Sequence, residues 1–319
     1  MSHPFTEPNS LRARLADPDA EVRRIAVLDL PYSDEDDYIE LLTAALADEA
    51  AGVRAEAAHA LEGVEEEAVV SALVPMLKDP DANVRQAVAD TLAELKEPRW
   101  GSLLLGMAGD AEPGVQASAL RALRALRVPE AFTPALAASA SSDAGVRREA
   151  VGVLAYLKNP EALVRLMQLA TGDSEAEVRK AAVGAMGFAG TSDVSSALEA
   201  ALADSVWLVR EEAAHTLGKL KASAAVAKLI TAMQDEYWQV RVASARALGK
   251  MKAVEALAVL LQALGHEMSN LRKEAAIALG GLGDVRALPA LEAASGDPDP
   301  DVRKLSRLAV ASIAAAQGA

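Results

Sequence analysis

Two pairs of glutamate and histidine have the spacing of metal ligands on a helix. Glu56 precedes His59 by three residues, and Glu212 precedes His215 by three. Residues three apart lie on one face of an α-helix, so each pair would present a carboxylate and an imidazole together, as metal ligation requires. Whether they form a site depends on the elements that position them.

Those elements are internal repeats. A valine, usually followed by arginine, recurs every 31 residues, with a single spacing of 32. The anchors are Val22, Val53, Val84, Val115, Val146, Val178, Val209, Val240, Leu271 and Val302. A fixed period in this range is typical of solenoid proteins.

Each repeat has apolar residues at helical spacing on both sides of a short break, as in "AVVSALVPMLKD" followed by "NVRQAVADTLAEL". Strand patterns are absent. We therefore expect an all-α fold, a right-handed α-solenoid (superhelix) of about ten two-helix repeats, forming one domain over residues 1–319. The extra residue in the longer spacing is expected at Thr171-Gly172, in the turn between helices.

Other positions recur with the anchor. Asp stands five residues before it in eight repeats, Arg follows it in nine, and a small residue stands four after it in nine. We expect the Asp to cap the second helix, for about 1 kcal/mol each. The Arg is expected to reach an Asp of the adjacent repeat, and the small residues let neighbouring helices approach. The recurring motif is therefore structural.

The repeats separate the two Glu-His pairs. They occupy identical places five repeats apart, roughly 50 Å at about 10 Å per helix layer, so one chain cannot join them around a metal. We interpret both as a solvated polar face. The chain has no Cys and 4 His, and no Gly-rich phosphate loop follows a strand. We expect no catalytic residue, no metal and no cofactor.

The "D-x-x-x-x-V-R-x-x-A" pattern and the helix endings "HTLGKL", "RALGKM" and "IALGGL" resemble HEAT-like repeats of the phycobilisome-lyase type, from about residue 11 onward. The resemblance implies a scaffold, an assembly factor, a chromophore lyase or, rarely, an enzyme. The enzyme is a deoxyhypusine hydroxylase, whose di-iron ligands are His-Glu pairs early in second helices. Here those positions lack His, and His266-Glu267 falls in a turn where other repeats have Asp. That activity is not expected.

The net charge of the chain limits the classes of partner that we expect. The formal net charge is −14, the wrong sign for holding phosphate, so nucleic acid and anionic membranes are not expected partners. The N-terminus "MSHPFTEPNS" has no signal pattern, and no apolar run approaches about 18 residues. We expect a soluble, cytoplasmic protein.

Departures from the repeat rule mark candidate binding residues. Six residues after the anchor, a variable position defines an exposed ridge that includes Gly152 and Gly184, with Tyr156 and Phe188 at the ends of the same helices. Glycine inside a helix destabilises it by about 1 kcal/mol against Ala. The pair either floors a hollow edged by aromatics or admits neighbouring side chains.

A second cluster consists of Trp207, Tyr237 and Trp238, which either anchor a protein interface or pack on the next turn. Glu211, His215 and Arg246 add mixed charge, which favours a protein partner. We therefore expect a non-catalytic protein-interaction scaffold or assembly factor that grips its partner in a concave groove over repeats 5 to 8. The alternative is a bilin-lyase-like protein that holds a tetrapyrrole and delivers it to a client.

Overall fold

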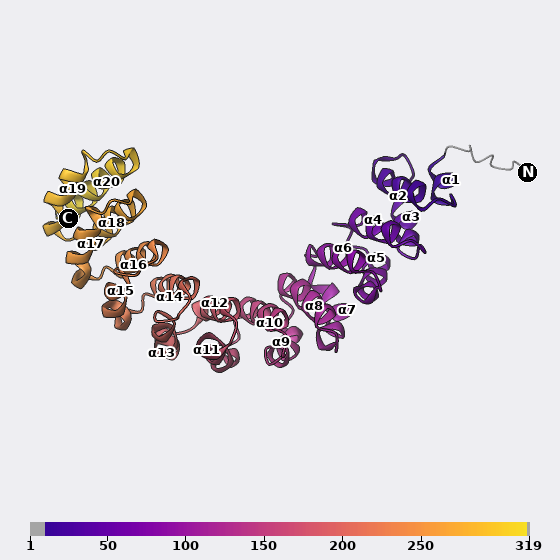
Figure 1. Ribbon diagram of the computed structural model, residues 1–319, viewed down its shortest axis with the longest axis horizontal. Helices are drawn as coiled ribbons and strands as arrows, with labels where there is room; N and C mark the ends of the chain where they lie inside the picture. Colours follow the sequence, from indigo (N-terminus) through magenta and orange to yellow (C-terminus); the bar gives the residue numbers. More distant parts are fainter. Residues whose placement is uncertain (1–9, 318–319) are drawn as a thin grey trace, which may run out of the picture. The chain divides into compact units, whose positions relative to one another are not determined.

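The computed structural model describes residues 10–317, and over that range its regular structure is helical, with no strand. Helices alternate along the chain between a first and a second helix of each repeat (Figure 1). The all-α stack of helix pairs predicted from the period is confirmed. The first nine residues, which contain most of the N-terminal stretch checked for a signal pattern, lie outside the described range.

The second helices each begin two residues before an anchor. They are α2 (Ala20–Asp29), α4 (Ala51–Ala60), α6 (Ala82–Ala93), α8 (Pro113–Leu126), α10 (Ala144–Leu157), α12 (Ala176–Ala185), α14 (Trp207–Leu220), α16 (Trp238–Met251), α18 (Ser269–Leu282) and α20 (Pro300–Gln317).

Most first helices are shorter than the second helix of their repeat, and most adjoin a 3₁₀ turn. They are α1 (Leu11–Leu15), α3 (Tyr38–Ala45), α5 (Glu67–Leu73), α7 (Gly101–Leu105), α9 (Phe132–Ala138), α11 (Leu163–Gly172), α13 (Thr191–Ala201), α15 (Val226–Ala232), α17 (Leu257–Leu264) and α19 (Leu288–Ala294). The 3₁₀ turns are η1 (Leu30–Tyr32), η2 (Val74–Lys78), η3 (Pro98–Trp100), η4 (Met107–Gly109), η5 (Pro129–Ala131), η6 (Pro160–Ala162), η7 (Met186–Phe188), η8 (Ser223–Ala225), η9 (Val254–Ala256) and η10 (Val285–Ala287).

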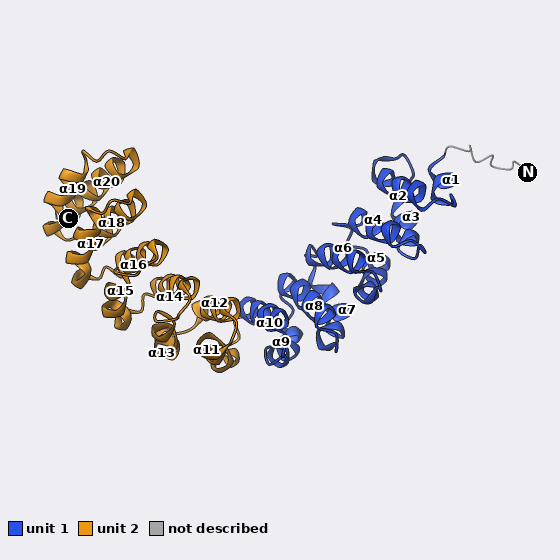
Figure 2. Ribbon diagram, in the orientation of Figure 1, with its two compact units in different colours: residues 1–157 blue, residues 158–319 orange. Residues whose placement is uncertain are grey.

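The chain divides into two compact units, residues 1–157 and residues 158–319 (Figure 2). Each is a stack of helix pairs in which consecutive second helices pack on one another, such as α4 on α6 in the first unit and α14 on α16 in the second. The interpretation of residues 1–319 as one domain stays a prediction.

The core of each unit is built by the recurring positions. The anchor Val84 and the small residue Ala57 have no exposed surface, and the same holds for Val209 and Ala213 in the second unit. Burying an aliphatic side chain of this size contributes roughly 1.5 to 3 kcal/mol, so one valine per repeat gives each layer its own share of core.

The glycine that ends several second helices allows two helix backbones to meet. A Cβ added at Gly249 of α16 would lie 2.6 Å from the Cα of Ala278 on α18. At Gly218 of α14 it would lie 2.8 Å from the Cα of Ala247 on α16. Any side chain there would push the backbones apart, so the "A-L-G" ending is a requirement of close packing between consecutive repeats.

The recurring Asp does not cap its helix, contrary to the prediction. Asp79 lies two residues before the N-cap of α6, where its Oδ1 accepts the N–H of Asp81 at 2.9 Å. Asp81 is the N-cap, and its own carboxylate accepts from the N–H groups of Asn83 and Val84. The recurring carboxylate therefore closes the turn ahead of the helix and remains available to a second partner.

For most of these aspartates that partner is the arginine of the preceding repeat, as predicted, whereas Asp110 pairs with Lys78. In each rung of this ladder the Nε of Arg donates to Oδ2 of Asp at 2.7 or 2.8 Å, and Nη2 donates to Oδ1 at 2.9 Å. The rungs are Arg23 to Asp48, Arg54 to Asp79, Arg179 to Asp204, Arg210 to Asp235 and Arg272 to Asp297. The Nη1 of the same arginines donates to carbonyl groups of their own turn, so one side chain joins two repeats.

The inserted residue is not in a turn. Thr171 and Gly172 both belong to the last turn of α11, and the helix is followed directly by Asp173. The first helix of that repeat therefore absorbs the extra residue by lengthening, because an added helical residue continues the hydrogen-bonded ladder while the interhelical turn keeps its fixed Asp geometry.

Candidate protein-binding face

Three consecutive second helices of the second unit, α14, α16 and α18, present a partly exposed stripe. Residues four apart on a helix lie on one side of it, so the first residue of each helix and those four and eight later share a face. We call these nine residues the binding face: Trp207, Glu211, His215, Trp238, Val242, Arg246, Ser269, Lys273 and Ile277. None of them is buried, and Ile277 is 49% exposed.

Aromatic rings gather at the N-terminal ends of α14 and α16. The rings of Trp207 and Tyr237 stack with centroids 5.6 Å apart and planes 13° from parallel. The guanidinium of Arg210 lies 5.7 Å from the centre of the Tyr237 ring. Trp238 is 38% exposed and Tyr237 40% exposed. The predicted cluster is thus partly paired within itself and still offers apolar surface to solvent.

A hollow of about 400 Å³ lies between α16 and α18, toward the other end of the same face. Its lining residues are Arg246, Gly249, Lys250, Glu274, Ile277, Ala278 and Gly281. The sequence interpretation named Arg246 but missed the hollow. The signal that could have found it is the glycine at the end of α16, because a helix pair that meets backbone to backbone leaves space where side chains would otherwise stand.

The charges on this face are mostly satisfied within the chain. Arg246 donates to both carboxylate oxygens of Glu274, at 2.6 and 3.1 Å, and Glu274 is only 6% exposed. This hydrogen bond raises the pKa of Arg246. Lys273 lies 3.2 Å from the carboxylates of both Asp299 and Asp301, whose hydrogen bonds raise the pKa of Lys273.

The predicted histidine also has a neighbour on its own helix. His215 Nε2 lies 4.0 Å from Glu211 Oε1, one helical turn earlier. The apolar surface that remains exposed belongs to Trp238 and Ile277 on the binding face and to Tyr237 beside it. A partner would therefore gain most from burying these side chains, with the ion pairs forming a polar rim.

The glycine positions are filled by neighbouring side chains. A Cβ added at Gly152 would lie 3.0 Å from Cδ of Arg124, and one added at Gly184 would lie 2.8 Å from Oε1 of Glu212. Gly152 belongs to the first unit and Gly184 to the second. Of the two interpretations of these glycines, the one that admits neighbouring side chains fits the contacts, and the space considered for a hollow beside each glycine is occupied.

The aromatics associated with those glycines differ in their surroundings. Tyr156 is 48% exposed, and the guanidinium of Arg127 lies 5.1 Å from the centre of its ring. Phe188 ends η7 and is partly exposed. Tyr156 therefore makes a cation–π contact at the end of α10 within the first unit, and each aromatic stays a candidate contact of its own unit.

Neither a cluster of side chains suited to a metal ion nor a helix able to span a membrane occurs among residues 10–317. No group of three or more histidine, aspartate or glutamate side chains in this range could hold a metal ion. Glu56, His59, Glu212 and His215 belong to no such group. No helix within the described residues has both the length and the apolar character needed to cross a membrane.

The repeats match a known family over most of the chain. The model of the HEAT repeats matches residues 8–80, 70–143, 132–218, 173–240 and 226–311. The chain belongs to the HEAT repeat family. The match is to HEAT repeats in general, and the phycobilisome-lyase type stays a resemblance. A search of the curated proteins finds no match.

Solved HEAT-like structures share the fold. An engineered protein is similar with a TM-score of 0.56 at 20% identity, over 95% of this chain and 98% of its own. Importin beta is similar with a TM-score of 0.64 at 15% identity, and Kap95 in a complex with Nup1 with a TM-score of 0.63 at 14% identity. The matches to importin beta and to Kap95 each cover 95% of this chain and 50% of the other, so the chain spans about half the length of these two proteins. At these identities the likeness is one of fold.

Proposed function

We propose that this HEAT repeat protein is a non-catalytic scaffold that binds a protein partner along the binding face of α14, α16 and α18. The observation that carries the proposal is the exposed apolar surface on neighbouring second helices, with Trp238 at one end and Ile277 beside the hollow at the other. Aromatic and aliphatic anchors that fill pockets contribute most of the affinity at protein interfaces.

The surroundings of these residues support a protein rather than a polyanion as the partner. Arg246 and Lys273 are both held by carboxylates of the chain, so neither offers a free positive charge to phosphate. With a formal net charge of −14, long-range attraction favours a partner that is basic or neutral overall. The complex of Kap95 with Nup1 is a HEAT-like fold bound to another protein.

The tetrapyrrole alternative has no observation of its own. Its support was the family resemblance and a possible hollow near Tyr156 and Phe188. The space beside the two glycines that would floor this hollow is occupied by Arg124 and Glu212. We therefore do not propose chromophore transfer.

The test places one negative charge on the binding face and, as a control, one negative charge at an exposed residue of the second unit outside that face. Ile277→Asp puts a carboxylate on the binding face at a residue that is 49% exposed, and Val285→Asp does the same in η10 at a residue that is 45% exposed. Both should fold, because substitutions at exposed positions usually change stability by less than about 0.5 kcal/mol.

A protein captured from the native host is purified, and its affinity for the wild-type chain and both variants is measured by calorimetry. We expect Ile277→Asp to weaken binding by more than about tenfold and Val285→Asp to leave it unchanged. Equal affinities for all three proteins would show that the partner does not bind at the binding face.

A further inference from the structure

The Arg–Asp ladder is interrupted at one place in the second unit. Arg210 pairs with Asp235 and Arg272 pairs with Asp297, each through two hydrogen bonds. Between these intact rungs stands Arg241, and the residue in the place of its aspartate is His266. An imidazole offers an arginine no carboxylate, so this rung lacks its anion.

Arg241 is nevertheless held as the other arginines of the ladder are. Its Nη1 donates to the carbonyl oxygens of Asp235 at 2.6 Å and Glu236 at 3.2 Å, as Nη1 of Arg210 donates to the two carbonyls that open its own turn. Its Nε is buried and has no hydrogen-bond partner. In the intact rungs the corresponding Nε and Nη2 donate to the two carboxylate oxygens. A buried donor without a partner costs about 1 to 3 kcal/mol, so the edge of the guanidinium favours an acceptor.

His266 reproduces one half of the missing aspartate. Its Nδ1 accepts the N–H of Met268 at 3.0 Å, as Asp235 Oδ1 accepts the N–H of Tyr237 at 2.9 Å. The turn ahead of α18 is thereby preserved. Because Nδ1 accepts, the ring proton of the neutral imidazole is on Nε2, which makes His266 a hydrogen-bond donor as well.

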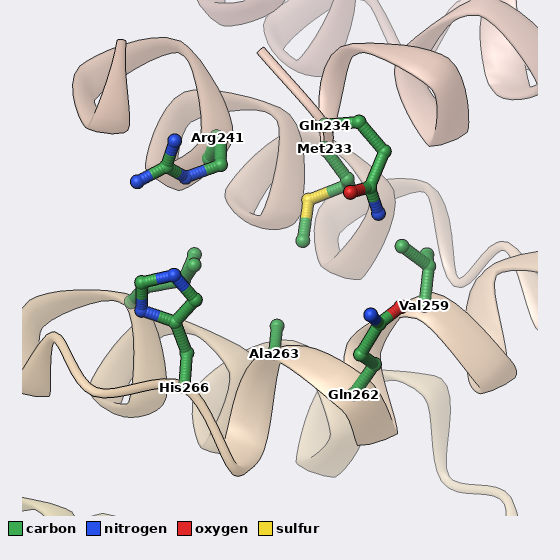
Figure 3. Close-up of a pocket in the computed structure, with 8 residues that line it drawn as sticks. Met233, Gln234, Arg241, Val259, Gln262, Ala263 and His266 are labelled. Carbon is green, nitrogen blue, oxygen red and sulfur yellow. The ribbon is translucent and has the colours of Figure 1, made fainter. Parts of the chain in front are cut away.

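A cavity of about 130 Å³ lies where these two residues meet. Arg241 and His266 line one side of it, and Gln234, Gln262 and Val259 line the other, with Met233 and Ala263 between them (Figure 3). The walls thus combine a cationic edge, apolar surface and two amides at the far side. A cavity of about 150 Å³ holds a molecule the size of benzene, so this one accommodates roughly four to six non-hydrogen atoms.

We propose that this cavity binds a short-chain monocarboxylate, whose oxygens accept from Nε and Nη2 of Arg241 as the oxygens of Asp do in the intact rungs. Two parallel donors on one edge of a guanidinium match the two oxygens of a carboxylate. The aliphatic chain of the ligand then lies against Met233, Val259 and Ala263. The site is separate from the binding face and does not depend on the proposed scaffold function.

The probe is butyrate, titrated into the purified full-length chain by calorimetry and by ligand-observed NMR. We expect saturable binding with a Kd on the order of 1 mM, and no binding of butan-1-ol, which has the chain but not the charge. Arg241→Met removes the donor edge and should weaken butyrate binding by at least about tenfold.

The sharper variants change His266 alone. His266→Asp supplies the carboxylate from within the chain, restores the rung and should abolish butyrate binding while raising the melting temperature. His266→Asn keeps an acceptor for the N–H of Met268 without adding a charge, and should bind butyrate within about threefold of the wild type. Because His266→Asp is expected to be more stable than the wild type, loss of binding in it cannot be attributed to unfolding.

A glutamate side chain of a peptide carries the same group as butyrate. The blocked peptide acetyl-Gly-Glu-Gly-amide is therefore titrated in parallel, and we expect it to bind at least about tenfold more weakly, because ordering its flexible backbone at the mouth of a cavity of about 130 Å³ opposes binding. Tighter binding of the peptide, equal binding of butyrate by His266→Asp and the wild type, or no saturation by butyrate would each overturn the proposal.

Discussion

The ladder makes a quantitative prediction at the rung between Arg54 and Asp79. In that rung Nε donates to Oδ2 at 2.8 Å and Nη2 donates to Oδ1 at 2.9 Å, and the two side chains are only 13% and 8% exposed. Asp79→Asn keeps an oxygen that can accept the N–H of Asp81, so the turn is preserved. It removes the charge and one of the two bonds to the guanidinium.

The size of the effect follows from the burial of this pair. A hydrogen bond to a charged group contributes about 1.5 to 3 kcal/mol, and breaking a buried ion pair costs about 3 to 5 kcal/mol. Because the pair is partly exposed and Asn retains one bond, we expect Asp79→Asn to lower the free energy of local opening by about 2 to 3 kcal/mol. Amide hydrogens of α4 and α6 should then exchange roughly 30- to 150-fold faster.

Asp17→Asn is the matched control. Asp17 accepts the N–H of Asp19 in the same turn geometry, but among the described residues no arginine side chain pairs with its carboxylate. We expect less than about 0.5 kcal/mol from this substitution. If Asp17→Asn and Asp79→Asn accelerated exchange equally, the turn and not the ladder would be the source of stability.

The pH dependence of stability provides a second test of the same rung. The hydrogen bond from Arg54 holds the pKa of Asp79 below its ordinary value of 3.8. A carboxylate whose folded pKa is lowered stabilises the fold fully above its unfolded pKa, and the contribution is lost as pH falls through the folded pKa. The difference between wild type and Asp79→Asn should therefore be constant above about pH 5 and shrink below about pH 4. A difference independent of pH over that interval would show that it is not electrostatic.

Three further substitutions test the packing of the second unit. Gly249→Ala places a Cβ 2.6 Å from a backbone atom of α18 and should lower the free energy of unfolding, measured in urea, by about 1 to 3 kcal/mol. Gly106→Ala is the control, because no atom lies within 4 Å of the added Cβ, and it should leave the free energy of unfolding unchanged. Equal effects of the two substitutions would contradict the close approach of α16 and α18. Glu274→Gln removes the charge that its arginine partner faces and should lower stability by about 1 to 3 kcal/mol in thermal unfolding, and an unchanged melting temperature would show that this ion pair contributes nothing. Tyr237→Ala removes the ring stacked on Trp207 and should reduce the near-ultraviolet circular dichroism, which would stay unaltered if the stack does not persist in solution.

The repeat period and the ladder could be predicted because every repeat must pack on its neighbours in the same way. Val-Arg and the Asp five residues earlier recur, and a chain of identical units has few ways to use a charged pair except between neighbours. Arg54 and Asp79 confirm that reasoning. The helix-cap role of the Asp was wrong because sequence spacing does not locate the first helical residue to within two positions, and the N-cap proved to be Asp81.

The binding face was harder to predict from the sequence because it depends on which residues of neighbouring helices come into contact. Trp207 and Trp238 occupy equivalent positions, but Trp207 stacks on Tyr237, whose extended backbone before α16 carries it toward the preceding repeat. The hollow beside Ile277 depends on the approach of Gly249 to α18, and a single chain position does not reveal such a contact.

The interruption at His266 was visible in the sequence as a histidine in the place of an aspartate. The consequence of this histidine was not visible, because it concerns Arg241 in the preceding repeat. The Nε of Arg241 is left buried without an acceptor. A departure from a repeat is therefore best interpreted together with the residue that the rule pairs with it.

Hydrogen exchange of the chain with and without its purified protein partner tests the central claim most directly. We expect protection from exchange to be concentrated in α14, α16 and α18, with the peptides that contain Trp238 and Ile277 protected most. Protection confined to the first helices α13, α15 and α17, or to residues 10–157, would contradict it.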